Sequence, residues 1–419
     1  MIYIYQILGD IRTYKPSKFI IKDNEAEILD NLDDENTYEL LLSSIFISKK
    51  IKNTENKKII FLKPISLDLD NETIGSYIEQ NFLSTKDYEI VDIPSYGMYG
   101  DKTYDYYPNE ILLSIFIDMV ERISIDDKIF IDINTGLNEY VTLLIAATTY
   151  LMVTLGLKNI RDEKILDVYE IISDPMVRKT TNYTSLFIQK INRKIFFSLP
   201  YTGEMKISKL IKVDCNCKSN FENKFEYKRY YRKIIADLTI IFNTVMFNAL
   251  PFISTLEDAI NDDKYSLLSN AINEIIKNFK DVLYNIDNRE IKVKDVYRLI
   301  NFIMDLEFYQ GLIDLLKDKL DDVTNVDKLS NVGEKIYKNK FINLPTNYEF
   351  LKRDIGAYEN DLDSHKEKDI KSNGNAIGSG KRNFFAHSGM DFNSCKISNK
   401  RIIYDLHKKD ERKKWLLNP

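Results

Sequence analysis

With 419 residues, 44% of them hydrophobic and 29% charged, the chain is long enough for two domains and has the composition of a soluble globular protein. Its formal net charge of −5 excludes a surface that is positive throughout, and its N-terminal residues lack the basic segment of a signal peptide. Three cysteines exclude a disulfide framework and favour a cytoplasmic protein.

Strand-like and helical patterns alternate through the first half of the chain. Apolar runs of strand length occupy residues 2–8, 59–62, 88–93, 128–133 and 166–172. Between them, helical spacing of apolar residues covers 37–49, 72–82, 109–123 and 137–155. Apolar strands that are separated by helices are typical of a parallel sheet with helices on both faces. We therefore predict an α/β, Rossmann-like domain over residues 1–180.

The longest apolar stretch, residues 140–157, raises the question of a membrane span. Threonines interrupt it at positions 142, 148, 149 and 154, and strand and turn signals flank it. These features favour a helix that is buried inside the α/β domain, so no membrane contact is expected.

The second half of the chain changes to long helical patterns. Residues 181–229 are interpreted as a connecting segment with one strand-like run at 188–199. Helical patterns then cover 230–250, 265–284, 293–320 and 347–360, which predicts an all-α domain over residues 230–419. The glycine-rich stretch 359–380 predicts a loop, and Ser379 is placed to cap a helix that opens at Gly380 or Lys381.

Three turns of the α/β domain are candidates for ligand contact. Ligands of such sheets bind beyond the carboxyl ends of the strands, where helices begin. The turns are residues 9–12 (GDIR), 95–97 (SYG) and 134–138 (NTGLN). None has the glycine spacing of a dinucleotide-binding turn or of a P-loop. The ligand is therefore expected to be neither an ordinary dinucleotide nor a nucleoside triphosphate in a P-loop.

The candidate catalytic residues lie near the C-terminus, in the segment RNFFAHSG that begins at Arg382. On a helix, Arg382 and His387 are separated by about 140° around the axis, so they share no narrow face. Two such helices packed about a two-fold axis would bring four polar groups together. A lone histidine on a half-apolar helix is also a common structural residue, and that alternative stays open.

Two motifs give the chain a resemblance to a known family. The hexapeptide RNFFAH (residues 382–387) is similar to the RxxxxH motif of HEPN ribonucleases, including the polar residue that often follows the arginine. The turn DINTGLN (residues 132–138) is similar to the D-x-T-H-G-x-N motif of the Csx group, with Asn134 and Thr135 in place of the threonine and histidine. The chain as a whole resembles the CRISPR-associated CARF–HEPN ribonucleases of type III systems. An activity of the sensor domain that relies on the motif's histidine, such as cleavage of the activator, would lack that group here, and whether the domain cleaves its activator stays open.

The resemblance implies an N-terminal CARF domain that binds a cyclic oligoadenylate, with cyclic tetra-adenylate favoured by analogy. The activator would lie across the two-fold axis of a homodimer, and a higher oligomer is also compatible. Its candidate contacts are Gly9, Asp10, Arg12, Tyr14, Ser95, Tyr96, Gly97, Asn134, Thr135, Gly136 and Asn138. Polar groups would bind phosphate or ribose, and a tyrosine would stack on adenine. Each of these residues is alternatively an ordinary turn residue.

The resemblance also implies a C-terminal HEPN domain that cleaves single-stranded RNA to a 2′,3′-cyclic phosphate and a 5′-hydroxyl. The 2′-OH of the RNA would attack the phosphate. His387 would assist proton transfer, and Arg382 would neutralise the scissile phosphate. Asn383 would orient either the histidine or a phosphate oxygen. No HExxH motif occurs, and Cys215 and Cys217 have no second pair, so neither a metal nor another cofactor is predicted.

Two other functions remain as alternatives. The first is a CARF regulator whose HEPN domain is non-catalytic and serves only dimerisation. The second is an oxidoreductase or transferase, for which the α/β domain lacks a nucleotide-binding fingerprint. The C-terminal residues 396–419 contain eight Lys or Arg against three Asp or Glu. That excess indicates either a solvated chain end or a contact with the RNA backbone.

Overall fold

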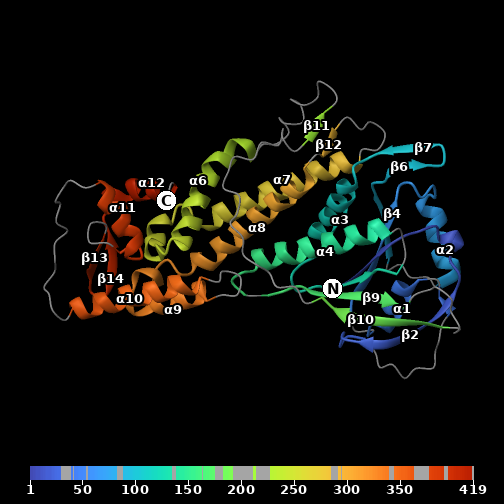
Figure 1. Cartoon of the computed structure of the whole chain (residues 1–419), viewed down its shortest axis with the longest axis horizontal. Coiled ribbons are helices and arrows are strands. Elements are labelled where there is room, and N and C mark those ends of the chain that lie inside the picture. Colours follow the sequence, from blue (N-terminus) through green and yellow to red (C-terminus); the bar gives the residue numbers. More distant parts are fainter. Residues whose placement is uncertain are drawn as a thin grey trace.

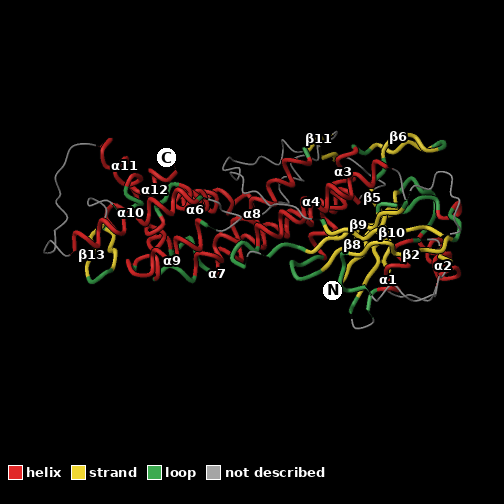
Figure 2. Tube along the Cα trace, turned by 60° about the horizontal axis from the view of Figure 1, so that its bottom comes forward, coloured by secondary structure: helices red, strands yellow, loops and turns green. Residues whose placement is uncertain are grey.

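The computed structural model of the chain is elongated, with a sheet domain at one end and a helical domain at the other (Figure 1). Figure 2 shows most strands gathered in the sheet domain, and helices that continue from it along the molecule. The structure describes residues 1–29, 39–40, 42–52, 55–82, 88–134, 138–162, 164–174, 183–191, 211–213, 227–284, 291–293, 295–338, 344–362, 377–390 and 395–417.

One eight-stranded sheet forms the N-terminal domain, in the order β3-β2-β10-β9-β8-β1-β4-β5. Its strands are β1 (Ile2–Ile7), β2 (Ser17–Asn24), β3 (Glu39–Leu40), β4 (Lys57–Pro64), β5 (Tyr88–Ile93), β8 (Lys128–Asp132), β9 (Asp167–Ser173) and β10 (Tyr183–Lys190). The five strands from β9 to β5 pair in parallel, whereas β10 is antiparallel to β9 and β3 is antiparallel to β2. The predicted parallel sheet is confirmed for these five strands. β10 carries the sheet past residue 180, where the domain was expected to end.

Helices cover both faces of this sheet, as its apolar strands require. The helices are α1 (Ser43–Lys50) and α2 (Asn71–Phe82) on one face, and α3 (Pro108–Arg122) and α4 (Asn138–Lys158) on the other. Residues of β1 alternate between the two layers. Ile2 and Ile4 belong to the core under α1, whereas Tyr3 and Tyr5 belong to the core under α3. This doubly wound arrangement fits the Rossmann-like domain that the sequence predicts.

Three local predictions in this domain need correction. The helix expected from residue 37 begins only at Ser43, because the backbone of Leu42 is still extended. The segment 95–97 is not a turn, since Tyr96 opens a hairpin of β6 (Tyr96–Tyr99) and β7 (Lys102–Asp105). The strand-like run at 188–199 starts earlier, inside β10, and its residues 192–199 lie outside the described ranges.

The second half of the chain is mostly helical. Its helices are α6 (Tyr227–Met246), α7 (Asp262–Tyr284), α8 (Val296–Lys317), α9 (Val326–Tyr337), α10 (Pro345–Leu362), α11 (Ile377–Ala386) and α12 (Lys409–Leu417). It also contains two short antiparallel pairs, formed by β11 (Ile211–Val213) with β12 (Ile291–Val293) and by β13 (Cys395–Ser398) with β14 (Arg401–Tyr404). The expectation of an all-α domain is corrected to that extent.

The glycine-rich segment before the RNFFAH motif is also shorter than predicted. α10 extends to Leu362, and α11 begins at Ile377 rather than at Gly380 or Lys381. Ser379 therefore lies inside α11, and the prediction that it caps the helix is wrong. Residues 363–376 lie outside the described ranges.

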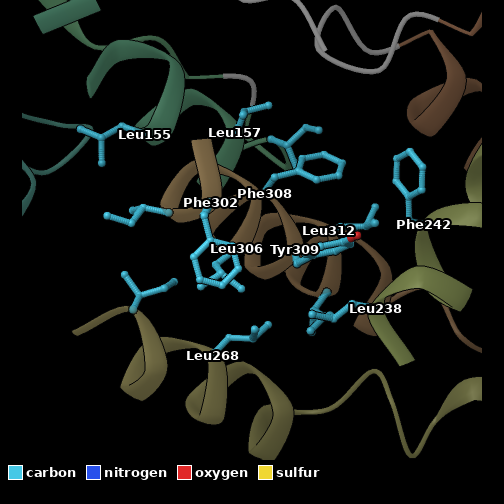
Figure 3. Packing of buried hydrophobic residues seen from close by; sticks show 14 of the residues in the cluster. Leu155, Leu157, Leu238, Phe242, Leu268, Phe302, Leu306, Phe308, Tyr309 and Leu312 are labelled. Atoms are coloured by element: carbon cyan, nitrogen blue, oxygen red, sulfur yellow. The ribbon is translucent and has the colours of Figure 1, made fainter. Parts of the chain in front are cut away.

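The two domains share one continuous core, because α3 and α4 lie between the sheet and the helices α7 and α8 (Figure 1). Figure 3 shows part of this core, to which Leu155 of α4, Leu268 of α7 and Leu306 of α8 contribute. Among the described helices, α4 alone is long and apolar enough to cross a membrane. Its packing between the sheet and α8 confirms the prediction of a buried helix.

α8 crosses the C-terminal end of α4 at Gly311. A Cβ added there would lie 2.3 Å from the carbonyl oxygen of Leu157 and 2.6 Å from that of Lys158. Beside this contact, Lys158 Nζ lies 3.1 Å from the carboxylate of Glu307. Glu307 is buried, and its burial raises the pKa of the carboxyl group. A glycine without a side chain and an ion pair with a buried carboxylate therefore lie where the two domains meet.

Gly311→Ala is expected to destabilise the protein by about 1–3 kcal/mol, the usual cost of forcing an extra methyl group into a packed contact. The clashing atoms are backbone carbonyls, which cannot move without displacing α4. The matched control is Gly356→Ala on α10, where an added Cβ meets no atom within 4 Å. Alanine should stabilise that helix by about 1 kcal/mol. Urea unfolding measures both variants, and equal midpoints would contradict this account of the junction.

Candidate functional site

The switch point of the doubly wound sheet lies between β1 and β8. β1 pairs with β4 on one side and with β8 on the other, and the two halves of the sheet extend in opposite directions from there. Ligands of such sheets bind beyond the carboxyl ends of the strands at this point. The structure places residues 9–14 after β1 and residues 133–134 after β8, so two of the three predicted turns follow adjacent strands.

Asp132 organises this edge of the sheet from a fully buried position at the end of β8. Its carboxylate accepts hydrogen bonds from Ser43 Oγ at 2.5 Å, from the Asn134 N–H at 3.0 Å and from Asn134 Nδ2 at 2.8 Å. Ser43 opens α1, so the carboxylate also lies at a helix N-terminus. Burial nevertheless raises the pKa of Asp132 to about 6. The aspartate of the DINTGLN motif therefore joins β8, α1 and Asn134, a role that the sequence did not indicate.

Residues 9–14 form a turn whose polar groups bind one another. The Gly9 N–H donates to the Tyr14 hydroxyl at 2.7 Å, so this amide is not free for the phosphate contact that we predicted. Asp10 accepts from Arg12 Nε at 2.8 Å and Nη2 at 2.9 Å, and the hydrogen bonds to Arg12 lower the pKa of Asp10. Arg12 is exposed and held in one orientation, but a phosphate has to compete with Asp10 for it.

The third predicted turn contributes differently from what we expected. Ser95 is fully buried, and its hydroxyl accepts from the Ser66 N–H at 3.1 Å and donates to the Ser66 hydroxyl at 3.0 Å. It offers no surface to a ligand, which corrects its assignment. Tyr96 donates its hydroxyl to the Glu139 carboxylate, and this hydrogen bond raises the pKa of Tyr96 to about 12. Gly97 is exposed and has a left-handed φ of +89°.

The NTGLN turn is described only at its two ends. The Asn134 side chain donates to Asp132, and its Oδ1 accepts from the Ser173 N–H at 2.5 Å, so both ends of its amide already have partners. Asn138 is the first residue of α4 and is exposed. Thr135 and Gly136 lie outside the described residues, and their proposed contacts stay predictions.

Most of the RNFFAH segment lies in the last turns of α11, where Phe384 anchors it, and His387 directly follows the helix. That side chain is fully buried, and its ring centroid lies 5.9 Å from that of Trp415 on α12. Arg382 and His387 are exposed on either side of this anchor, and Asn383 is half-buried. The structure thus presents the two predicted catalytic side chains to solvent, next to a firmly packed ring.

The basic C-terminal segment is partly structural. Arg412 is buried, and its guanidinium lies 3.8 Å from the centroid of the Trp415 ring and 5.9 Å from that of Phe384. Lys400 pairs with Asp327 at 3.1 Å. A solvated chain end therefore does not account for all of these basic residues. The other basic residues of the segment neither support nor exclude the predicted contact with RNA.

Within the part of the chain that the structure describes, no three His, Cys, Asp or Glu side chains are grouped so that they could hold a metal ion. Cys395 is buried, whereas Cys215 and Cys217 lie outside the described ranges.

Fold and site together define a two-domain protein. Its Rossmann-like domain has a switch point that is lined by polar turns, and its helical domain presents an arginine and a histidine to solvent. Residues 3–175 match the family model described as "CRISPR system endoribonuclease Csx1, CARF domain". This match supports a CRISPR-associated protein with an N-terminal CARF domain. It covers about two fifths of the chain and leaves the helical domain unmatched. None of the curated proteins matches the chain.

Asp132→Asn is expected to remove a pH dependence of the free energy of unfolding. A carboxyl group with a raised folded-state pKa stabilises the fold while it is protonated in both states, and this contribution is lost as the pH rises towards the folded pKa, here about 6. Relative to the wild type, the variant should gain about 1.4 kcal/mol between about pH 5 and about pH 8. Urea unfolding measures the gain. The exposed Asp321→Asn is the control, and the same gain there would contradict the assignment.

Proposed function

We propose that the protein is a cyclic-oligoadenylate-activated endoribonuclease of type III CRISPR defence, with a CARF sensor domain and a HEPN nuclease domain. The family match supports the sensor, because its residues 3–175 include both strands of the switch point. The observation that carries the nuclease is the exposure of Arg382 and His387 around the buried Phe384. Groups that act on a substrate phosphate need such exposure.

The proposed reaction uses groups of α11 and of the RNA itself. His387 accepts the proton of a 2′-OH, which attacks the adjacent phosphorus. The bond to the 5′-oxygen breaks, that oxygen takes a proton from water and leaves as a hydroxyl, and His387 returns its own proton to water. Arg382 stabilises the negative charge that builds up on the phosphate, and Asn383 orients the histidine or a phosphate oxygen. DNA has no 2′-OH and is therefore not cleaved. The route requires no metal and no cofactor other than the activator.

A homodimer completes both sites in this proposal. Two α11 helices packed about a two-fold axis bring two copies of Arg382 and His387 together, and one cyclic oligoadenylate, with the tetra-adenylate favoured, spans two sensor domains. An apolar surface beside the motif supports such packing. The rings of Phe247 and Phe385 lie 5.5 Å apart between centroids, and Phe247 is 41% exposed.

α4 supports a connection between the two sites. Its first turn carries Asn138 and Glu139, beside the predicted activator contacts, and its last turn packs against α8 at Gly311. A ligand that displaces the first turn displaces a helix whose other end is locked to the helical domain. Activation further requires that the ligand binds one arrangement of the dimer more tightly than the other.

A ligand-sensing regulator without catalysis is the second candidate. The observation that favours it is the extent of the family match, which covers the sensor domain and none of the helical domain. Such a protein would bind duplex DNA or a partner protein in response to the activator, and it would leave single-stranded RNA intact.

His387→Ala tests the nuclease. Loss of a general acid–base group is expected to lower kcat by about 10²–10⁴-fold and to leave RNA binding little changed. Cleavage of single-stranded RNA is followed without metal, with cyclic tri-, tetra- or hexa-adenylate added in turn. His407→Ala is the matched control, because His407 is likewise exposed, on a short turn of 3-10 helix (Leu406–Lys408). Normal cleavage by His387→Ala would refute its assignment, and an inactive wild type would favour the regulator.

Arg12→Ala tests the sensor. Removal of a charge-assisted hydrogen bond to phosphate is expected to raise the half-activating concentration of the cyclic oligoadenylate about tenfold or more, while activity at saturation is kept. Lys15→Ala removes the same charge three residues further on, where the side chain is also exposed. If both variants shift by the same factor, Arg12 acts through general electrostatic attraction and makes no specific contact.

A further inference from the structure

The residue after His387 departs from the usual chemistry of a helix C-terminus. The His387 N–H donates to the Asn383 carbonyl at 3.0 Å and the Gly389 N–H donates to the Phe384 carbonyl at 2.8 Å, as in a Schellman cap. Between them, Ser388 has a left-handed φ of +53°. Glycine is the usual residue in that conformation, because a Cβ is strained there. A serine at this position needs a specific reason.

The hydroxyl of Ser388 supplies that reason. It is fully buried, donates to Asp354 Oδ2 on α10 at 2.7 Å and accepts from Asn248 Nδ2, beyond the end of α6, at 2.7 Å. Asn248 and Asp354 are each only 5% exposed, and Asn248 itself has a left-handed φ of +59°. Three buried polar side chains from separate parts of the chain therefore meet directly behind His387. We call Asn248, Asp354 and Ser388 the clamp.

The backbone around His387 is held on both sides by further contacts. The Met390 N–H donates to the His387 carbonyl at 2.7 Å, and the Tyr404 hydroxyl donates to the Gly389 carbonyl at 3.0 Å. Gly389 has a φ of +76° and lies against Ala249, whose Cα would be 3.1 Å from an added Cβ. The ring of His387 is exposed, whereas its point of attachment cannot shift without breaking buried contacts.

We propose that the clamp positions His387 for proton transfer, so that Asn248, Asp354 and Ser388 are positioning residues. The proposal rests on the nuclease function proposed above. A proton-transfer group has to lie within hydrogen-bond distance of the attacking 2′-OH, and a displacement of about 1 Å costs on the order of 10²-fold in rate. A buried hydrogen bond to the Asp354 carboxylate is directional, so it holds the turn in one place where a glycine would leave it free to move.

Ser388→Gly is the decisive variant, because it removes the hydroxyl and keeps the left-handed backbone unstrained. We expect kcat to fall about 10- to 100-fold, with KM for RNA within about twofold of the wild type and the variant still folded at the assay temperature. The control is Asn399→Gly, since Asn399 also has a left-handed φ, +50°, but lies in the β13–β14 turn. An unchanged kcat in Ser388→Gly overturns the proposal.

Asp354 tests the hydrogen bond by a conservative pair of changes. Asp354→Asn keeps an oxygen that accepts from Ser388, whereas Asp354→Leu does not. The asparagine variant should keep kcat within about threefold, and the leucine variant should lose as much as Ser388→Gly does. Equal losses in both variants would contradict the role of the hydrogen bond. Circular dichroism checks that the leucine variant is folded. If that variant is unfolded, the result for Ser388→Gly alone tests the proposal.

A readout without RNA cleavage separates the clamp from the proposed function. The chain has three histidines, so the ring signals of a histidine-labelled protein can be assigned with His365→Gln and His407→Gln. Ser388→Gly is expected to shift and broaden the nuclear magnetic resonance signal of His387 and to leave that of His407 in place. An unchanged His387 signal overturns the clamp in a protein that does cleave RNA. A shifted signal in a protein that cleaves none supports the clamp and refutes the nuclease.

Discussion

The arrangement of the two domains depends on one close crossing, where α8 passes the end of α4 at Gly311. Carbonyl oxygens of α4 occupy the space that any side chain would need. The same crossing buries the Glu307 carboxylate beside the half-buried Lys158. An ion pair of this kind stabilises a fold only when its geometry is well held, because the carboxylate loses its water. Arg161, just beyond α4, adds a 2.7 Å pair to Asp318 beyond α8. The glycine allows the helices to approach, and the charges then favour a single register between them.

This crossing explains why α4 resembles a membrane span. One side of the helix covers the sheet and the other side packs against α8, so apolar residues are needed around most of its circumference. Its four threonines are compatible with burial because each hydroxyl donates to the carbonyl four residues earlier in the helix. Charged groups are confined to its ends, Glu139 in the first turn and Lys158 in the last. The charged groups of this helix therefore lie at the switch point and at the helical domain, which are the two places that the proposed activation has to connect.

Local patterns predicted those parts of the fold whose residues interact mainly with a uniform core. The parallel strands and the four helices of the first half follow from apolar periodicity, but β2 was missed because its burial alternates irregularly at the margin of the sheet. α9 was missed because it contains Gly333, which weakens a helix, although that glycine makes room for Leu351. In the candidate site, the exposed pair Arg382 and His387 is encoded in six consecutive residues. The clamp is not, because Asn248 lies 140 residues from Ser388 and Asp354 lies 34 from it.

Ser388 and Asp132 both depart from the usual preferences of their residue types, and they serve different purposes. Both residues are fully buried, and both are unfavourable there: Ser388 has a left-handed backbone, and the Asp132 carboxylate is removed from water. In each case hydrogen bonds with distant segments of the chain compensate for the cost. Asp132 has a sufficient structural role, since it joins a strand to the start of α1. Glycine would end α11 at lower cost, and the chain uses one at the very next position, Gly389. The serine adds hydrogen bonds to α10 and to the residue beyond α6, and in the proposed nuclease these bonds also fix the location of the exposed His387 beside it.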